Sequence, residues 1–300
     1  MTDPADGPRS MLFIPADAER FLAKAGQRGA DALILDLEDG VAPSAKDAAR
    51  AALADAIARL GPAGVPIWVR VNAVPERLES DLRAAVNAGA HGVLMPKVDA
   101  PAGLHALGAL LDRAEADAGR AVGSTRVMAL LESPASLIDA PAIGRASPRL
   151  DALVFGVEDF AATLGIAPHP EAMTGPAQTV VIAAAAAGLQ AIGLPGSVAD
   201  FSDPPAYRAL VEHARRIGLR GSVCIHPSQV AVVNQVFGGS DEEIARARAL
   251  LAAFDAALAE GRGAVAHDGR MVDEPIARRA RALLARHERL AARGPAAAPR

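Results

Sequence analysis

The chain has little of what marks disulfide-bonded, nucleic-acid-binding or membrane-spanning proteins. Its 300 residues include one cysteine, Cys224, so no disulfide can form within the chain, which fits a reducing compartment. Aromatic residues make up 3% of the sequence and the formal net charge is −4. No basic stripe with interleaved aromatic residues occurs, which argues against nucleic acid as a partner. No apolar stretch approaches the roughly 18 residues that a membrane-spanning helix needs.

Signals for secretion and for several common enzyme classes are missing as well. The segment MTDPADGPRS lacks the basic and apolar regions of a signal peptide, so we expect a cytoplasmic protein with no membrane partner. The chain contains neither the GxGxxG nor the P-loop motif, and the ESP tripeptide at 132–134 lacks a glycine elbow. Cys224 lies in an apolar run, which favours a buried structural thiol over a nucleophile.

Apolar residues, by contrast, make up 51% of the chain and recur in eight short runs, each followed by a segment of helical periodicity. Strands that are buried on both faces of a parallel sheet are nearly all apolar, as these runs are. Eight strand–helix units predict a (β/α)8 TIM barrel, which we expect over residues 1–262. The runs are Met11–Pro15, Ala32–Leu37, Pro66–Val71, Gly92–Pro96, Arg126–Leu131, Ala152–Gly156, Gln190–Leu194 and Gly221–Ile225.

A different stretch follows the barrel, and we treat residues 263–300 as a C-terminal helical extension. Its sequence predicts a short loop or hairpin around Asp268 and Gly269, then a basic helix from about Pro275. The barrel fold does not need this segment. It therefore serves either in oligomerisation or in an active site, and composition alone does not choose between the two.

Polar residues at the ends of the expected strands are the candidates for chemistry, because barrel enzymes work at the C-terminal ends of their strands. Glu132 and Asp159 follow the fifth and sixth runs, which are neighbours, so the two carboxylates should converge at one rim. Two hard oxygen ligands with room for water and substrate suit Mg²⁺, and no Cys/His cluster suggests zinc. Glu158 is an alternative to Asp159, and spacing does not decide between them.

A guanidinium follows the third run and acids follow the second. Arg70 at the rim is suited to gripping a carboxylate bidentately. Asp36, Glu38 and Asp39 crowd the neighbouring strand end. In one interpretation, one of these acids merely forms a salt bridge with Arg70. In the other, the acids orient the arginine for the substrate and hold metal-bound water. The two interpretations are compatible. If these acids orient Arg70 and hold metal-bound water, Glu38 is a candidate catalytic residue.

Three further residues have two interpretations each. Lys97 ends the fourth run, so a Schiff-base lysine must be considered, although such an aldolase has no use for a paired-carboxylate metal site. His226 is either a general base or a histidine held by backbone groups at the barrel mouth. Asp273, in the segment MVDEP, is on residue type alone a surface acid.

Taken together, the sequence resembles the citrate lyase β-subunit-like branch of the HpcH/HpaI aldolase superfamily. The motifs occur in the order and at the spacing typical of that family and cover nearly the whole chain. They are FIP (13–15), LILDLEDGVAP (33–43), VRVN (69–72), MPKV (95–98), LLESP (130–134), FGVEDF (155–160), CIHPSQ (224–229) and DGRMVDEP (268–275).

The resemblance implies a Mg²⁺-dependent enzyme that makes or breaks a carbon–carbon bond next to a CoA thioester. By the family pattern Glu132 and Asp159 bind the metal, with Glu132 also contacting substrate. Arg70, beside Asp36, binds the keto-acid carboxylate. Asp273 transfers the proton and is typically delivered to a neighbouring subunit's site, which implies a homo-oligomer, a trimer or hexamer, and gives the extension a purpose.

The chain departs from the family pattern at two places. Many members have an aspartate at the end of the seventh strand, where this chain has Gly193. Many have Arg-Pro after the first strand, near the CoA phosphates, where this chain offers Arg20 and Lys24 instead. Both departures bear on which acyl-CoA is bound and leave the metal site intact.

The expected reaction is the cleavage or formation of a citryl-, malyl- or citramalyl-type 3-hydroxyacyl-CoA, giving a 2-keto acid and an acyl-CoA. Three alternatives stay open: a metal-dependent aldolase of free hydroxy-keto acids, a malyl-CoA thioesterase, and a non-catalytic subunit of a lyase complex.

Overall fold

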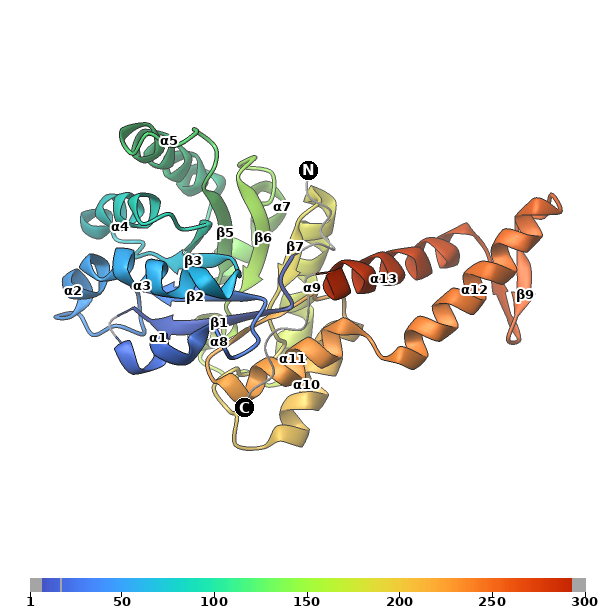
Figure 1. The fold of residues 1–300 in the computed structure, drawn as a ribbon. Coiled ribbons are helices and arrows are strands. Elements are labelled where there is room, and N and C mark those ends of the chain that lie inside the picture. Colours follow the sequence, from blue (N-terminus) through green and yellow to red (C-terminus); the bar gives the residue numbers. More distant parts are fainter. Residues whose placement is uncertain (1–6, 17, 293–300) are drawn as a thin grey trace. The chain divides into compact units, whose positions relative to one another are not determined.

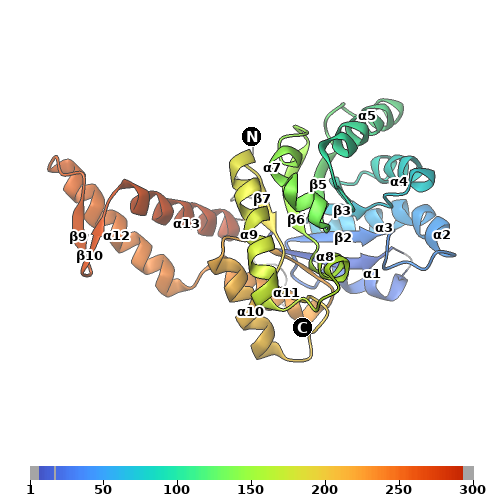
Figure 2. The same ribbon diagram turned by 180° about the vertical axis from the view of Figure 1, so that it is seen from behind.

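The computed structural model describes residues 7–16 and 18–292, and its first part is a barrel of eight parallel strands with helices outside them (Figures 1 and 2). The strands alternate with helices along the chain, as predicted. The strands are β1 (Ser10–Pro15), β2 (Ala32–Asp36), β3 (Ile67–Arg70), β4 (Gly92–Met95), β5 (Arg126–Leu131), β6 (Leu150–Phe155), β7 (Gln190–Ile192) and β8 (Ser222–Cys224).

The helices of this part cover the outside of the strands. α8 begins two residues after the end of β6, and α6 and α11 each begin three residues after the preceding strand, so these helices start close to the barrel mouth. The helices are α1 (Glu19–Ala25), α2 (Lys46–Ala51), α3 (Leu53–Leu60), α4 (Pro75–Asn87), α5 (Pro101–Asp117), α6 (Pro134–Ile138), α7 (Ala140–Ile143), α8 (Val157–Leu164), α9 (Pro170–Ala187), α10 (Pro204–Arg216) and α11 (Pro227–Gly238).

Hydrogen bonds run around the strands in the order β7-β6-β5-β4-β3-β2-β1-β8. Between β8 and β7 a single bridge, Ile192 with Gly221, replaces a full ladder, and the N–H of Gly193 donates to the carbonyl of Gly221 at 2.9 Å. The barrel is therefore nearly closed, and the predicted (β/α)8 fold is confirmed.

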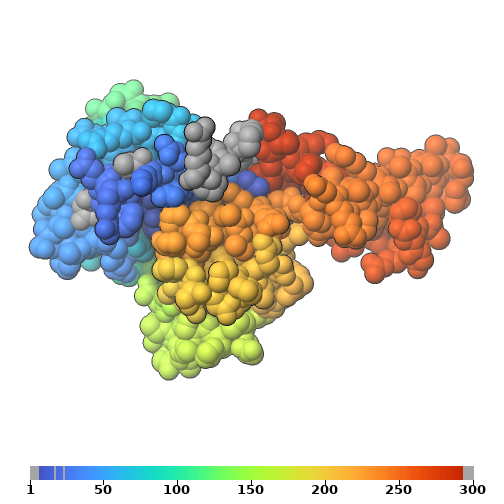
Figure 3. Space-filling view, turned by 60° about the horizontal axis from the view of Figure 1, so that its bottom comes forward, coloured from blue at the N-terminus to red at the C-terminus, as the bar shows by residue number. Residues whose placement is uncertain are grey.

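The last part of the barrel is tied to the first by side chains as well as by strands. Ser10 Oγ donates to Asn234 Oδ1 at 2.7 Å, and Asn234 Nδ2 donates to the carbonyl of Gly29 at 2.7 Å. The blue N-terminal surface and the orange surface of α11 accordingly lie side by side in Figure 3. These contacts join segments more than 200 positions apart and hold the two ends of the barrel together.

The barrel interior is filled by side chains from alternate strand positions. Trp68 is the largest of them, is 2% exposed, and meets the ring of His91 edge-on at 5.0 Å. Because successive strand residues point to opposite faces, this inward set leaves the other set to pack beneath the helices. The inward set comprises Met11, Ala32, Ile34, Trp68, Leu94, Met128, Leu130, Ala152, Val154 and Ile192.

A buried ion pair joins α5 to the start of β6. Arg149 donates to Glu115 from both terminal nitrogens, at 3.0 and 2.7 Å, and Glu115 also accepts the N–H groups of Gly123 and Thr125. Burial raises the pKa of Glu115, but these donors outweigh it and lower that pKa to about 2. The carboxylate is thus held ionised inside the protein.

Within the described residues, 235–292 form a second compact unit. It contains α12 (Asp241–Ala259), the antiparallel strands β9 (Val265–His267) and β10 (Arg270–Val272), and α13 (Glu274–Ala292). Asp268 and Gly269, with φ of 47° and 71°, make the turn between the strands. The predicted hairpin and the following helix are therefore present, while the domain boundary expected at residue 262 stays a prediction.

None of the helices in the described ranges 7–16 and 18–292 combines the length and the apolar character that crossing a lipid bilayer requires.

Candidate active site

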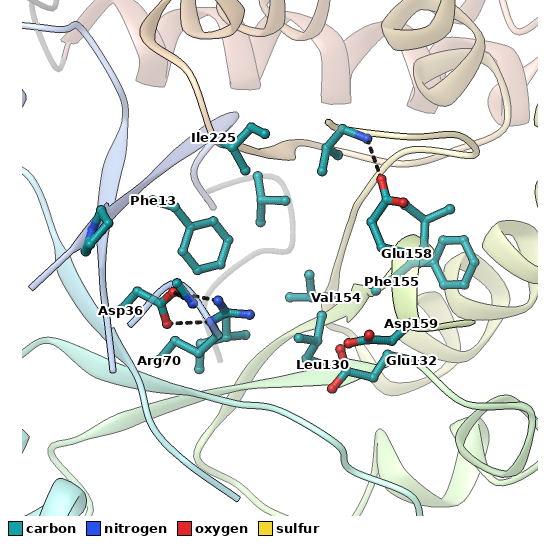
Figure 4. A pocket seen from close by; sticks show the side chains of 17 residues that line it. Phe13, Asp36, Arg70, Leu130, Glu132, Val154, Phe155, Glu158, Asp159 and Ile225 are labelled. Atoms are coloured by element: carbon teal, nitrogen blue, oxygen red, sulfur yellow. Dashed lines mark hydrogen bonds and ion pairs between the residues drawn. The ribbon is translucent and has the colours of Figure 1, made fainter. Parts of the chain in front are cut away.

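A cavity of about 310 Å³ opens at the C-terminal ends of the barrel strands, where the sequence predicts the chemistry (Figure 4). Charged side chains lie on two opposite sides of its wall, and the rest of the lining is apolar or glycine. The cavity is lined by Phe13, Pro15, Asp36, Gly40, Arg70, Leu94, Leu130, Glu132, Val154, Phe155, Gly156, Val157, Glu158, Asp159, Val198, Val223 and Ile225.

Arg70 is held against Asp36 by the register of two neighbouring strands. The two residues end β3 and β2 and are directly paired. Arg70 Nε donates to Asp36 Oδ1 at 2.7 Å, and Arg70 Nη2 donates to Asp36 Oδ2 at 2.6 Å. Asp36 also accepts the backbone N–H groups of Glu38 and Gly40, each at 2.9 Å. Both Asp36 oxygens are thus used within the protein, and the carboxylate fixes the direction of the guanidinium.

Glu38 connects the arginine to a lysine. Its Oε2 lies 3.1 Å from Arg70 Nη1, and its Oε1 accepts a hydrogen bond from Lys97 Nζ at 2.7 Å. The Phe13 ring lies 4.7 Å from Arg70 Cζ and closes another side of the guanidinium. Burial lowers the pKa of Arg70, but the hydrogen bond and charge of Asp36 and the charge of Glu38 outweigh it and raise that pKa. The arginine stays charged and restrained, as the orienting interpretation requires.

Glu132 and Asp159 lie together on the opposite side of the cavity. Glu132 directly follows β5, Asp159 lies in the first turn of α8, and their carboxyl groups face each other in Figure 4. Glu132 is 6% exposed and accepts the backbone N–H of Lys97 at 2.7 Å. Burial, together with the charge of Asp159, raises the pKa of Glu132 to about 8.

The donor set of this carboxylate pair fits a divalent cation. Burial of Glu132 and the nearby charge of Asp159 both disfavour the ionised form of Glu132, and a bound cation would offset both effects. Across the described residues, no cluster of three or more His, Cys, Asp or Glu side chains is placed to hold a metal. A pair of carboxylates that leaves the other positions to water and substrate is the arrangement Mg²⁺ commonly uses.

Glu158, the alternative ligand, points away from this pair. Its Oε1 accepts hydrogen bonds from Ser197 Oγ at 2.6 Å and from the N–H of Val198 at 3.2 Å (Figure 4). Glu158 therefore fastens the loop after β7 to α8. The structure brings Asp159, rather than Glu158, to Glu132.

Residues 9–227, most of the barrel, match the sequence profile of the HpcH/HpaI aldolase/citrate lyase proteins. The chain belongs to the HpcH/HpaI aldolase/citrate lyase family. The resemblance inferred from the motifs is thus confirmed.

Curated relatives of this family member span nearly its whole length. The citrate lyase subunit beta of Escherichia coli K12 is 33% identical over 283 residues, covering 93% of each chain. The L-malyl-CoA/beta-methylmalyl-CoA lyase of Cereibacter sphaeroides ATCC 17025 is 32% identical over 315 residues, covering 96% of this chain and 97% of the relative.

A solved structure agrees in fold over the same extent. The CitE protein of Mycobacterium tuberculosis, in complex with magnesium, acetoacetate and coenzyme A, superimposes with a TM-score of 0.76 and 32% identity. It covers 95% of this chain and 99% of that one.

Besides Glu38, which pairs with Arg70, three of the site residues expected in this family member are not among the residues that line the cavity. Arg20 and Lys24 are exposed on α1, and Arg20 lies over the Phe21 ring at 4.5 Å. Asp273 belongs to the second unit, immediately before α13, where its Oδ1 accepts the N–H of Ile276 at 3.3 Å. The roles expected of these three residues stay predictions.

Two features of the site have no signal in the sequence. Lys97 has a left-handed backbone, with φ of 55°, which turns its N–H toward Glu132. Phe13 lies against the Arg70 guanidinium, although the sequence indicates only that it is a strand residue.

At Gly193, φ is 144° and an added Cβ would lie 3.0 Å from Phe155 Cβ, so the aspartate expected from the family would be strained there.

The remaining candidates are structural. His226 Nδ1 lies 2.7 Å from Ser228 Oγ, its backbone N–H donates to Gln229 Oε1 at 3.0 Å, and its ring stacks on Phe201 at 4.4 Å. These contacts favour the interpretation of a histidine held in place at the mouth. Cys224 is fully buried and burial raises the pKa of its thiol to about 12, so the expected structural thiol is confirmed.

Proposed function

We propose that the protein is a Mg²⁺-dependent carbon–carbon lyase that converts a 3-hydroxyacyl-CoA into a 2-keto acid and an acyl-CoA, or forms it from them. The observation that carries the proposal is the placement of the Glu132–Asp159 pair and the Arg70 guanidinium around one cavity. Lyases of citryl and malyl type among its relatives support the reaction class, and the magnesium and coenzyme A bound to a solved relative support the cofactor and substrate.

The acidic and basic residues of the cavity have different roles in this reaction. Glu132 and Asp159 hold the cation, which when bound polarises the substrate's hydroxyl or keto oxygen as a Lewis acid. Arg70 binds the keto-acid carboxylate end-on, and Asp36 contributes to substrate binding by fixing the guanidinium. Glu38 keeps Arg70 and Lys97 in place. The apolar wall excludes water from the bond that reacts.

In the cleavage direction the substrate hydroxyl loses its proton, the adjacent carbon–carbon bond breaks, and the electron pair passes to the carbon next to the thioester. A proton returned to that carbon completes the acyl-CoA, so the reaction only moves a proton from oxygen to carbon. We assign this proton transfer to Asp273, and in condensation the same carboxylate removes the proton. Arg20 and Lys24, both exposed cations on α1, are assigned to the CoA phosphates.

One assay separates the lyase from its rivals. The protein is incubated with Mg²⁺ and citryl-, malyl- or citramalyl-CoA, and keto acid and free thiol are followed together. Keto acid without thiol supports the lyase, whereas release of thiol identifies a thioesterase. No reaction with any thioester, but turnover of a free hydroxy-keto acid, identifies an aldolase, and complete inactivity supports a non-catalytic subunit.

We further propose that residues 263–300 cap the site of a neighbouring subunit in a homo-oligomer, a trimer or hexamer. Mixing two inactive variants tests this directly. Asp273→Asn lacks the proton-transfer group and Asp159→Asn lacks a metal ligand, so hybrid oligomers regain part of the activity if the two residues of one site come from different chains. Light scattering measures the oligomer size. Mixtures that stay inactive although hybrids form contradict the shared site.

A further inference from the structure

The ammonium of Lys46, the first residue of α2, lies between the segments that follow β2 and β3. Lys46 Nζ donates to the backbone carbonyls of Leu37 at 3.3 Å and Glu38 at 3.1 Å. It also donates to Asn72 Oδ1. All three acceptors are neutral oxygens, and an ammonium has three N–H groups to donate. One side chain therefore joins the chain just after β2 to the chain just after β3.

Asn72 takes part in the same connection. Its Nδ2 donates to the carbonyl of Leu37 at 2.8 Å and to Asp81 Oδ2 at 2.7 Å. The carbonyl of Leu37 thus accepts hydrogen bonds from both Lys46 and Asn72. The side chains of Asn72 and Asp81 are buried, so water does not replace a partner that is lost. Buried polar groups without a partner are costly, which makes this arrangement resistant to movement.

Glu38 connects this arrangement to the cavity. Its backbone N–H donates to Asp36 Oδ1 at 2.9 Å, and its carbonyl accepts a hydrogen bond from Lys46. Its carboxylate Oε2 lies 3.1 Å from Arg70 Nη1. The backbone of Glu38 is thus fixed on both sides of its Cα, and its side chain contacts the guanidinium that lines the cavity. A shift of this backbone would move the carboxylate away from Arg70.

Lys46 itself is not among the described residues that line the cavity, so its effect on the site passes through other residues. Loss of its ammonium would remove a charge-assisted hydrogen bond from each of three oxygens, two of which belong to the backbone. Asp36 would still bind Arg70 through both carboxylate oxygens. The guanidinium would therefore remain at the cavity but lose the fixed backbone that sets the position of Glu38.

We propose that Lys46 is a positioning residue of the active site, which holds the backbone at residues 37–38 so that Arg70 is directed at the substrate carboxylate. The proposal rests on the lyase function above, in which Arg70 binds the keto acid. A guanidinium binds a carboxylate best in one plane, so a small rotation of it weakens binding. Loss of Lys46 should therefore weaken keto-acid binding and spare the metal site on the other side of the cavity.

Arg50, four residues further along α2, provides a matched control. It donates to Asp81 Oδ1 at 3.1 Å and to Asp47 Oδ1 at 2.7 Å, rather than to the backbone at residues 37–38. Arg50→Met takes a cation from a buried carboxylate and should lower the urea midpoint of unfolding at least as much as Lys46→Met does. If Lys46 only stabilised the fold, the two variants would have the same effect on the active site.

Hydrogen exchange and calorimetry compare both variants with the unchanged protein. In Lys46→Met, the peptide that covers residues 36–41 should exchange its amide hydrogens about tenfold faster, because its backbone loses a donor. With saturating Mg²⁺, the dissociation constant of the keto acid should rise about tenfold in Lys46→Met. The keto acid is pyruvate, glyoxylate or oxaloacetate, whichever the unchanged protein binds most tightly. In Arg50→Met both quantities should stay within about twofold, as should the Mg²⁺ dissociation constant of either variant.

The outcomes separate this proposal from the proposed function. Unchanged hydrogen exchange in Lys46→Met overturns the positioning role whether or not a ligand binds. Faster exchange with unchanged keto-acid affinity also overturns it, as does an equal loss of affinity in Arg50→Met. If the unchanged protein binds none of the keto acids in the presence of Mg²⁺, the lyase function is refuted, and the exchange measurement still decides whether Lys46 holds this backbone.

Discussion

The backbone N–H of Lys97 donates to Glu132 Oε1 at 2.7 Å from a left-handed conformation, with φ of 55°. The same residue places its ammonium 2.7 Å from Glu38 Oε1. One residue therefore contacts the metal-binding side of the cavity through its main chain and the arginine side through its side chain. A non-glycine residue with this φ is disfavoured by about 1 kcal/mol or more, so the surrounding contacts must stabilise it.

This relationship predicts different outcomes for two substitutions of Lys97. Lys97→Gly keeps the N–H and relieves the backbone strain, whereas Lys97→Ala keeps the strain; both remove the ammonium. We expect the alanine variant to be less stable than the glycine variant by about 1 kcal/mol in urea unfolding. In both, KM for the substrate should rise because Glu38 is left with Arg70 alone, while the glycine variant keeps its Mg²⁺ affinity. An alanine variant at least as stable as the glycine variant would argue against strain.

The two acids of the GVED segment should separate in a metal-binding experiment. Asp159→Asn removes a carboxylate that faces Glu132, so the Mg²⁺ dissociation constant measured by calorimetry should rise by about tenfold or more. Glu158→Gln changes a residue that binds Ser197 and Val198, and should leave the Mg²⁺ dissociation constant within about twofold. Loss of Mg²⁺ binding in Glu158→Gln, with binding retained in Asp159→Asn, would exchange the roles of the two residues.

Gly156 has no side chain, and this leaves the space that the Glu132 side chain occupies. An added Cβ would lie 2.6 Å from Glu132 Cβ and 2.8 Å from Oε2, so Gly156→Ala must displace the carboxylate. We expect a loss of Mg²⁺ affinity of roughly tenfold, as is typical when a group supporting a ligand is disturbed.

The control for this variant is Gly108→Ala in α5. A Cβ there meets nothing within 4 Å, so Mg²⁺ affinity should stay unchanged and the free energy of unfolding should rise by about 0.5–1 kcal/mol. A Gly156→Ala protein that binds Mg²⁺ normally would show that Glu132 has room to move.

The buried Glu115–Arg149 pair makes the stability depend on acid pH. The pKa of Glu115 is lowered from 4.5 to about 2 in the folded protein. Its contribution is therefore fully present above pH 4.5 and is lost as the pH falls toward 2. Glu115→Gln should lower the free energy of unfolding by about 3–5 kcal/mol at neutral pH, and the difference should shrink below pH 4.5.

Urea unfolding over a pH series measures this difference. Glu79→Gln, at an exposed pair with Arg83 on α4, is the control and should change the free energy of unfolding by less than about 1 kcal/mol. A difference for Glu115→Gln that does not depend on pH would contradict the lowered pKa.

The barrel was predictable because its strands are marked in two independent ways. Runs such as Arg126–Leu131 are nearly all apolar, as strands covered on both faces must be, and each is followed by a helical segment. The turn at Asp268 and Gly269 was also predictable, since this pair favours a left-handed hairpin turn. What periodicity did not indicate was the placement of α12 in the second unit, because its helical pattern is the same in either unit.

The sequence by itself determined the kind of fold, the family, and the strand ends at which acids and an arginine would gather. Only the tertiary structure decided which of these groups meet. Glu158 and Asp159 are adjacent in the chain, yet successive side chains of α8 point in different directions, so one contacts the loop after β7 and the other faces Glu132. Likewise the pairing of Arg70 with Asp36 depends on the register of β2 against β3, and the bond from Lys97 to Glu132 depends on the backbone after β4, which are properties of packing rather than of residue order.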